Sequence, residues 1–157
     1  MSPVSNPNER QVGGSHYNQV SVQHWDLVLT NRLPYLEAQI TKYITRWKKK
    51  NQAVNDIDKS QHYLEKLIVS IEEGSLPLPT PELTSCLSPR VPLLNLDEFA
   101  KQNKIGDLEK TVFYLLLTYT SMDDLLRVRI LLSHLMAEAK DFEATCVTSG
   151  TSECACP

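Results

Sequence analysis

The chain has 157 residues, 41% of them hydrophobic, which is enough for one good core or two small helical units. Its formal net charge of −3 excludes the overall basicity of a general nucleic-acid coat protein, so we expect no duplex nucleic acid as a partner. The sequence lacks both an apolar run of membrane-spanning length and the apolar core of a signal peptide, so we expect a cytoplasmic protein with no membrane partner.

The first elements are an arm and a short helix. Residues 1–15 are rich in Pro, Asn, Gly and Ser and contain almost nothing that could form a core, so we expect a flexible arm that becomes ordered near His16. Apolar residues between Val22 and Asn31 predict a short helix. Pro34 stops this helix, because a proline ring disfavours helical geometry in the residue before it.

The stretch 36–50 predicts a helix that ends in positive charge. Lys42 and Arg46 are four residues apart, so they share a face and can converge on one anion, and Lys48-Lys49-Lys50 continue the charge. The alternative is a solvated basic face whose cations suit the helix dipole. Apolar residues at spacings of three and four mark the side that packs in a core: Leu36, Ile40, Tyr43, Ile44 and Trp47.

The next helix runs to Glu72, with Asn55 as the expected N-cap. Two helices joined by a short loop pack antiparallel, so the polar side of this helix can approach Lys42 and Arg46. That side carries Asp56, Lys59 and Tyr63, which share one stripe.

We predict an all-α fold, a small helical bundle of two lobes, 16–74 and 96–143, joined by the proline-rich linker 75–95. The second lobe comprises helices from Leu96 to Asn103, from Asp107 to Tyr119, and from an N-cap at Ser121 with Asp124 to about Phe142. The middle one is apolar on most sides, so it packs on the first lobe or on another subunit, and we expect a homo-oligomer. We expect residues 144–157 to be a disordered tail.

Several well-known catalytic motifs are absent. None of the five glycines has the spacing of a phosphate-binding P-loop, and the Rossmann, H-E-x-x-H and G-x-S-x-G patterns are also missing. The histidines form no pair with metal-ligand spacing, and the Cys154-x-Cys156 pattern lacks a second pair, so we expect no bound metal. No cofactor is indicated by a motif.

The first lobe resembles a small phage-encoded family typified by the nucleotide kinase of bacteriophage T7. The family pattern is His-Tyr, a turn with Trp or Pro, Gly-Asn-x-x-Lys-Tyr-x-x-Arg, a basic loop, and Asp-Leu-x-Lys-Ala-x-x-Tyr-Leu. The chain has His16-Tyr17, Trp25-Asp26, then Ala38-Gln39 followed by Lys42-Tyr43 and Arg46, then Lys49-Lys50, and finally Asp56, Lys59 and Tyr63-Leu64. The resemblance covers about residues 14–72.

This resemblance implies a helical nucleotide-binding module that phosphorylates deoxynucleoside monophosphates, with ATP as the phosphate donor, in the cytoplasm of a phage host. On that hypothesis Lys42, Arg46 and Lys50 contact phosphates, and His16 and Tyr17 close over the nucleotide. Catalytic roles would fall to Lys59, near the transferred phosphoryl group, and to Asp56, which would orient Lys42 or Arg46. Tyr43 or Tyr63 would stack on the base, with packing as the alternative.

The chain departs from the family where Ala38-Gln39 replaces Gly-Asn, so that a longer amide, that of Gln39, would read the nucleotide. This change leaves two alternatives to a kinase. The first is a non-catalytic protein that sequesters a nucleotide, including a signalling nucleotide of antiviral defence. The second is a protein-interaction module that uses the apolar second lobe.

Overall fold

A computed structural model of the chain describes residues 20–80 and 96–148, and within them it contains six helices and no strand. The helices are α1 His24–Asn31, α2 Tyr35–Arg46, α3 Ala53–Glu72, α5 Leu96–Asn103, α6 Asp107–Thr118 and α7 Met122–Thr148. The predicted all-α fold is confirmed. Within the described ranges, no helix is both long and apolar enough to cross a membrane.

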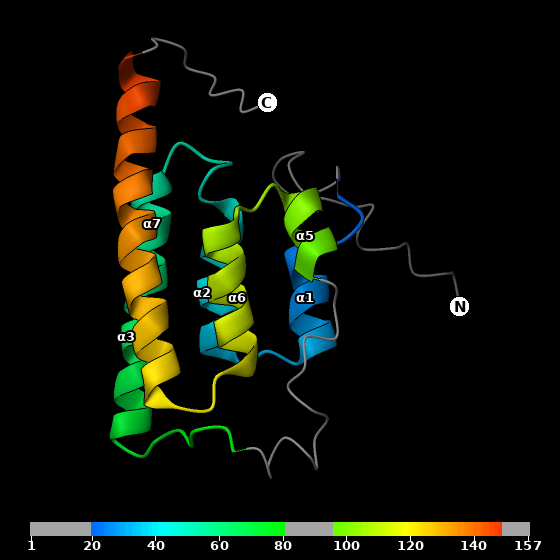
Figure 1. Cartoon of the computed structure of the whole chain (residues 1–157), viewed down its shortest axis with the longest axis vertical. Coiled ribbons are helices and arrows are strands. Elements are labelled where there is room, and N and C mark those ends of the chain that lie inside the picture. The colour runs from blue at the N-terminus through cyan, green and yellow to red at the C-terminus, as the bar shows by residue number, and fades with distance from the viewer. Residues whose placement is uncertain (1–19, 81–95, 149–157) are drawn as a thin grey trace, which may run out of the picture.

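The helices are arranged as pairs of opposite direction. In Figure 1, α1 and α5 lie on one side, α2 and α6 in the middle, and α3 and α7 on the other side. Helix α3 packs against α2 and α7, and α6 packs against α7 and touches α2. The colour gradient in Figure 1 shows that α3 and α7 run antiparallel.

One hydrophobic core joins both predicted lobes. The apolar hairpin α6–α7 packs on the first lobe of the same chain. This is one of the two alternatives that the sequence left open. Trp47, for example, meets Phe142 of α7 edge-on, with 5.8 Å between ring centroids. The core takes side chains from all six helices, among them Leu27, Ile40, Ile44, Ile57, Leu64, Phe99, Phe113, Leu116, Leu125 and Leu132.

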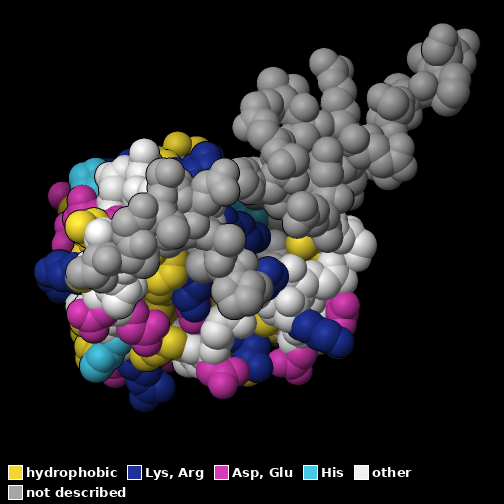
Figure 2. Space-filling view, turned by 90° about the horizontal axis from the view of Figure 1, so that it is seen from above, with side chains coloured by type: hydrophobic (Ala, Val, Ile, Leu, Met, Phe, Trp, Pro, Cys, Tyr) yellow, Lys and Arg dark blue, Asp and Glu magenta, His cyan; other side chains and the backbone are white. Residues whose placement is uncertain are grey.

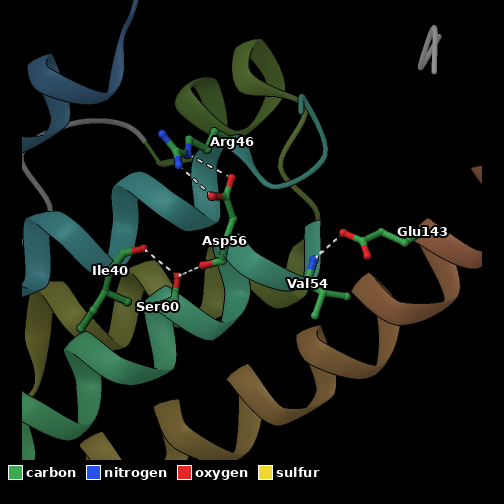
Figure 3. A network of polar contacts seen from close by, with 6 residues as sticks. All are labelled: Ile40, Arg46, Val54, Asp56, Ser60 and Glu143. Carbon is green, nitrogen blue, oxygen red and sulfur yellow. Dashed lines mark hydrogen bonds and ion pairs between the residues drawn. The ribbon is translucent and has the colours of Figure 1, made fainter. Parts of the chain in front are cut away.

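Local signals correctly predict where α7 begins, but not where α3 begins. Ser121 and Asp124 exchange bonds: the Asp124 N–H donates to Ser121 Oγ at 3.3 Å, and the Ser121 N–H donates to Asp124 Oδ2 at 3.2 Å. Helix α3 starts at Ala53, so Asn55 is not its N-cap. Glu143 of α7 takes over the capping, because its Oε1 accepts the Val54 N–H at 2.9 Å (Figure 3).

Helix α7 continues past its predicted end near Phe142 and reaches Thr148. The expected tail 144–157 is therefore wrong over its first five positions. The sequence explains the extension, because neither glycine nor proline occurs after Phe142 until Gly150. The arm 1–15, His16, Tyr17, residues 81–95 and residues 149–157 lie outside the described residues.

Candidate anion-binding site

The central contact of the site joins the last turn of α2 to the first turn of α3. Arg46 donates two parallel hydrogen bonds to the Asp56 carboxylate, from Nε to Oδ2 at 3.0 Å and from Nη2 to Oδ1 at 2.7 Å (Figure 3). The Asp56 side chain is 0% exposed and that of Arg46 is 17% exposed. The predicted approach of these two residues is confirmed. Such a fork fixes the plane of the guanidinium group, which a single-bonded ammonium could not achieve.

A serine lets α2 and α3 approach closely beneath this pair. Ser60 is fully buried, and its hydroxyl donates to the Asp56 carbonyl at 3.1 Å and lies 3.4 Å from the Ile40 carbonyl (Figure 3). A larger side chain at this position would separate the helices. The geometry of Arg46 and Asp56 therefore depends on the packing of the hairpin as well as on their own charges.

Three cations surround the ring of Tyr43. The Arg46 guanidinium carbon lies 4.6 Å from the ring centroid, and the ammonium nitrogens of Lys59 and Lys42 lie 5.3 and 5.7 Å from it. Tyr63 stacks on the same ring, with 5.9 Å between centroids and 17° between planes. We call Lys42, Tyr43, Arg46, Asp56, Lys59 and Tyr63 the cation-aromatic cluster. The structure thus brings together six of the ten residues predicted from the sequence.

The basic run after α2 mostly serves the fold. Lys48 donates to Glu109 Oε1 at 2.7 Å, and the Trp47 indole N–H donates to the same oxygen at 3.2 Å. Lys49 donates to Asn103 Oδ1 at 3.3 Å, and burial, with a smaller effect of a neighbouring lysine, lowers its pKa. Sequence reasoning missed Glu109 because its donors lie more than 60 positions earlier in the chain.

Lys50 is not brought to the cluster. It lies in the turn after α2, its side chain is exposed, and no contact with the cluster is found among the described residues. The position of Lys50 therefore does not support the prediction that it contacts the same phosphates as Lys42 and Arg46.

A groove of about 420 Å³ between α1 and α2 adjoins the cluster. Ala38 and Gln39, which stand at the Gly-Asn position of the pattern, line it together with Lys42. The α1 side contributes His24, Trp25, Asp26, Val28 and Leu29. Trp25 and Leu29 are among the exposed large hydrophobic residues, so the groove offers apolar surface beside a cation.

His24 lines this groove and is neutral at physiological pH. Its Nε2 is 2.8 Å from the Thr41 hydroxyl, and burial, aided by nearby Lys42, lowers its pKa to about 4. Histidines with one hydrogen-bonding partner inside a helical hairpin are usually structural. The contact with Thr41 and the neutral ring fit a structural role for His24.

Acid is expected to destabilise the chain through His24. In the unfolded chain this histidine titrates near 6.5, but its folded pKa is about 4. Between these two pKa values, His24 is protonated in the unfolded state but not in the folded state. The folded state therefore has its full stability above about pH 6.5 and loses stability as the pH drops to about 4. The loss reaches up to about 3 kcal/mol. Urea unfolding at several pH values between 7 and 4 measures it.

The comparison variant for this experiment is His24→Gln. Its amide can still form a hydrogen bond with Thr41 but does not bind a proton. Its stability should depend less on pH than that of the wild type. His62→Gln, at an exposed histidine of α3, is the control for the exchange itself and should leave the acid-induced loss caused by His24 in place. Equal slopes for the wild type and His24→Gln would contradict the burial of a neutral imidazole.

Charges on the rest of the visible surface are mixed. In Figure 2, Lys and Arg side chains alternate with Asp and Glu side chains over the face seen from above. In 20–80 and 96–148, no three His, Cys, Asp or Glu side chains are grouped so that they could hold a metal ion. On the face seen in Figure 2, the Lys and Arg side chains form no broad basic surface.

Comparison with known proteins places the cluster in a matched region of unknown function. Residues 7–65 match the model of the family DUF3310, which is described as a protein of unknown function. The match includes α1, α2 and most of α3, and it covers less than half of the chain. No curated protein matches the chain. No solved structure matches it either.

Proposed function

We propose that the chain binds a nucleotide, or a nucleotide-like phosphorylated small molecule, at the cation-aromatic cluster and the adjoining groove. The observation that carries this proposal is the convergence of Lys42, Arg46 and Lys59 on the Tyr43 ring. Three cations lie around this ring, and the buried carboxylate of Asp56 pairs with one of them, Arg46, which leaves a local excess of positive charge. A compact polyanion compensates such a cluster better than water does.

Lys42 connects the two halves of the proposed site. It belongs to the cluster and also lines the groove between α1 and α2. In the proposal the phosphate lies against Lys42, Lys59 and Arg46, and the base lies in the groove. Trp25 offers a face for stacking, and the Gln39 amide offers both a donor and an acceptor for the base edge.

Arg46 and Asp56 act as a unit in this proposal. Asp56 is fully buried and both of its oxygens accept bonds from Arg46, so it positions the guanidinium group and takes no proton from a substrate. Lys59 stands on α3 within reach of the same ring, where it would neutralise charge on a phosphoryl group. The site supports binding more directly than it supports catalysis.

Calorimetric titration with the common deoxynucleoside monophosphates tests the proposal. Each charge-assisted bond is worth about 1.5–3 kcal/mol, so Lys42→Ala and Lys59→Met should each weaken binding by about ten- to a hundredfold. Lys66→Ala is the matched control, because Lys66 is an exposed lysine of α3 outside the cluster. Absence of binding by every nucleotide tested, or equal binding by all variants, would refute the proposal.

Catalysis is decided by the fate of the bound ligand. A kinase transfers the terminal phosphoryl group of ATP to an oxygen of the monophosphate, which leaves ADP and a deoxynucleoside diphosphate. Incubation with ATP followed by chromatography detects both products. Recovery of the monophosphate unchanged, after tight binding and release by heat, would identify the non-catalytic binder instead.

A further inference from the structure

The pair α5–α6 repeats the geometry of α1–α2. Both pairs consist of a helix of 8 residues, a three-residue turn and a helix of 12 residues. The first residue of each turn is left-handed, Arg32 with φ 49° and Lys104 with φ 56°. The N–H of the next residue, Leu33 or Ile105, donates to the carbonyl five residues earlier, at 3.0 and 2.8 Å. Equivalent residues are 72 positions apart.

Side chains follow the same correspondence. Asn31 and Asn103 each donate to the carbonyl four residues earlier, at 2.9 and 3.1 Å. Leu27 and Phe99 are both fully buried. The sequence shows the relation as Asn-Arg-Leu-x-x-Leu-Glu in the first pair and Asn-Lys-Ile-x-x-Leu-Glu in the second. Further buried pairs at this separation are Ile40 with Val112 and Ile44 with Leu116.

The contacts between the two pairs are reciprocal. Glu37, 2% exposed, accepts the Tyr119 hydroxyl at 2.7 Å, and Glu109, also 2% exposed, accepts the Trp47 indole N–H at 3.2 Å. Glu109 is the equivalent of Glu37, and Tyr119 is the equivalent of Trp47. When residue i contacts residue j and their equivalents contact each other in the opposite sense, the two units are related by a two-fold axis.

The third helices agree with this symmetry. Buried residues of α3 at 57, 60, 64 and 67 have the spacing of those of α7 at 125, 128, 132 and 135. The helices α3 and α7 run antiparallel and pack on each other, as a two-fold axis between them requires (Figure 1).

We propose that the chain is a covalent pair of like helical units, in which residues 96–148 occupy the place of a second subunit on the face of residues 20–80. The unit that matches the known family model is the first one. The face of that unit formed by α2 and α3 therefore fits a second copy of the same fold. In this chain the second copy is residues 96–148, which belong to the same polypeptide. The original reason for expecting a homo-oligomer disappears, because this face is covered within one chain.

The two units differ at the cation-aromatic cluster. The equivalents of Lys42, Tyr43 and Arg46 are Tyr114, Leu115 and Thr118, and each has the same degree of exposure as its counterpart. The second unit builds the same turn and helix without these residues, so this turn and helix can form without them. In the terms of the proposed function, on which this step rests, each chain has one nucleotide site.

Two ligand-free experiments on the whole chain test the paired arrangement. In sedimentation equilibrium, the wild type should have the mass of one chain over a wide range of concentrations. In a symmetrised chain, residues 24–46 replace residues 96–118, so that both units carry the first sequence up to the end of their second helix. This chain should retain the wild-type helix content and the mass of one chain, with a lower melting temperature.

Either of two results would overturn the pairing: a wild type that sediments as a dimer or larger assembly, or a loss of helix content in both the symmetrised chain and a milder exchange. The milder exchange guards against a simple packing failure. It replaces only residues 103–109 by residues 31–37, which transfers the turn and the buried glutamate. If the larger replacement unfolds and the milder one also unfolds, the equivalence is wrong; if the milder one folds, the pairing stands.

Titration of the wild type separates this inference from the proposed function. The expected stoichiometry is one nucleotide per chain. One-chain mass with no binding would leave the paired architecture intact and remove the nucleotide proposal. Two sites per chain with one-chain mass would keep the pairing and contradict the assignment of the cluster to the first unit alone.

Discussion

Arg46→Met is expected to destabilise the folded chain by about 3–5 kcal/mol, because it leaves the buried Asp56 carboxylate without its ionic partner. Asp56 is 0% exposed and accepts two bonds from Arg46, and no other side-chain donor to it is found among the described residues. Urea unfolding followed by circular dichroism measures the loss. The midpoint should fall with little change in the slope.

A matched lysine and a double variant make this prediction specific. Lys42→Met removes a cation from the same helix, but at an exposed position, and should change stability by less than about 0.5 kcal/mol. Arg46→Met combined with Asp56→Leu removes both charges and should recover most of the loss. A loss below about 1 kcal/mol for Arg46→Met alone would show that the pair is not a buried one.

Helical periodicity was enough to predict the cluster. The spacing of Lys42 and Arg46 places them on one face, and the short loop to α3 brings Asp56, Lys59 and Tyr63 opposite them. Periodicity does not show depth, so the complete burial of Asp56 was not foreseen. That burial goes with the close packing of α2 and α3, where Ser60 lies against the Ile40 carbonyl.

Contacts that are distant in sequence account for what the sequence did not reveal about the fold. Asn55 looked like the cap of α3, but Glu143, 89 positions after Val54, does the capping. The run Lys48-Lys49-Lys50 looked like a free basic surface, yet Lys48 is paired with Glu109. The repeat was visible in the sequence as two Asn-Arg/Lys-Leu/Ile-x-x-Leu-Glu stretches, but seven positions without context are too few to establish it.

Glu109→Ala is expected to destabilise the chain by about 2–4 kcal/mol. The substitution leaves the buried Trp47 indole N–H and the Lys48 ammonium without an acceptor at Glu109 Oε1, and an unpaired buried donor alone costs about 1–3 kcal/mol. The contribution of Lys48 is the smaller one, because its side chain is 37% exposed. Thermal and urea unfolding measure the loss, and Glu65→Ala, at an exposed glutamate of α3, should be nearly neutral.

The equivalence of the two units makes this prediction stricter. Glu37 occupies in α2 the place of Glu109 in α6, and it is the acceptor of a ring donor from the other unit. Glu37→Ala should therefore lower the free energy of unfolding by a similar amount. The loss should be smaller only by the contribution of Lys48, because the residue equivalent to Lys48 in the second unit is Thr120, which carries no charge. If Glu109→Ala unfolds the chain and Glu37→Ala is neutral, the interface is held from one side only, and its reciprocal contacts do not contribute equally to stability.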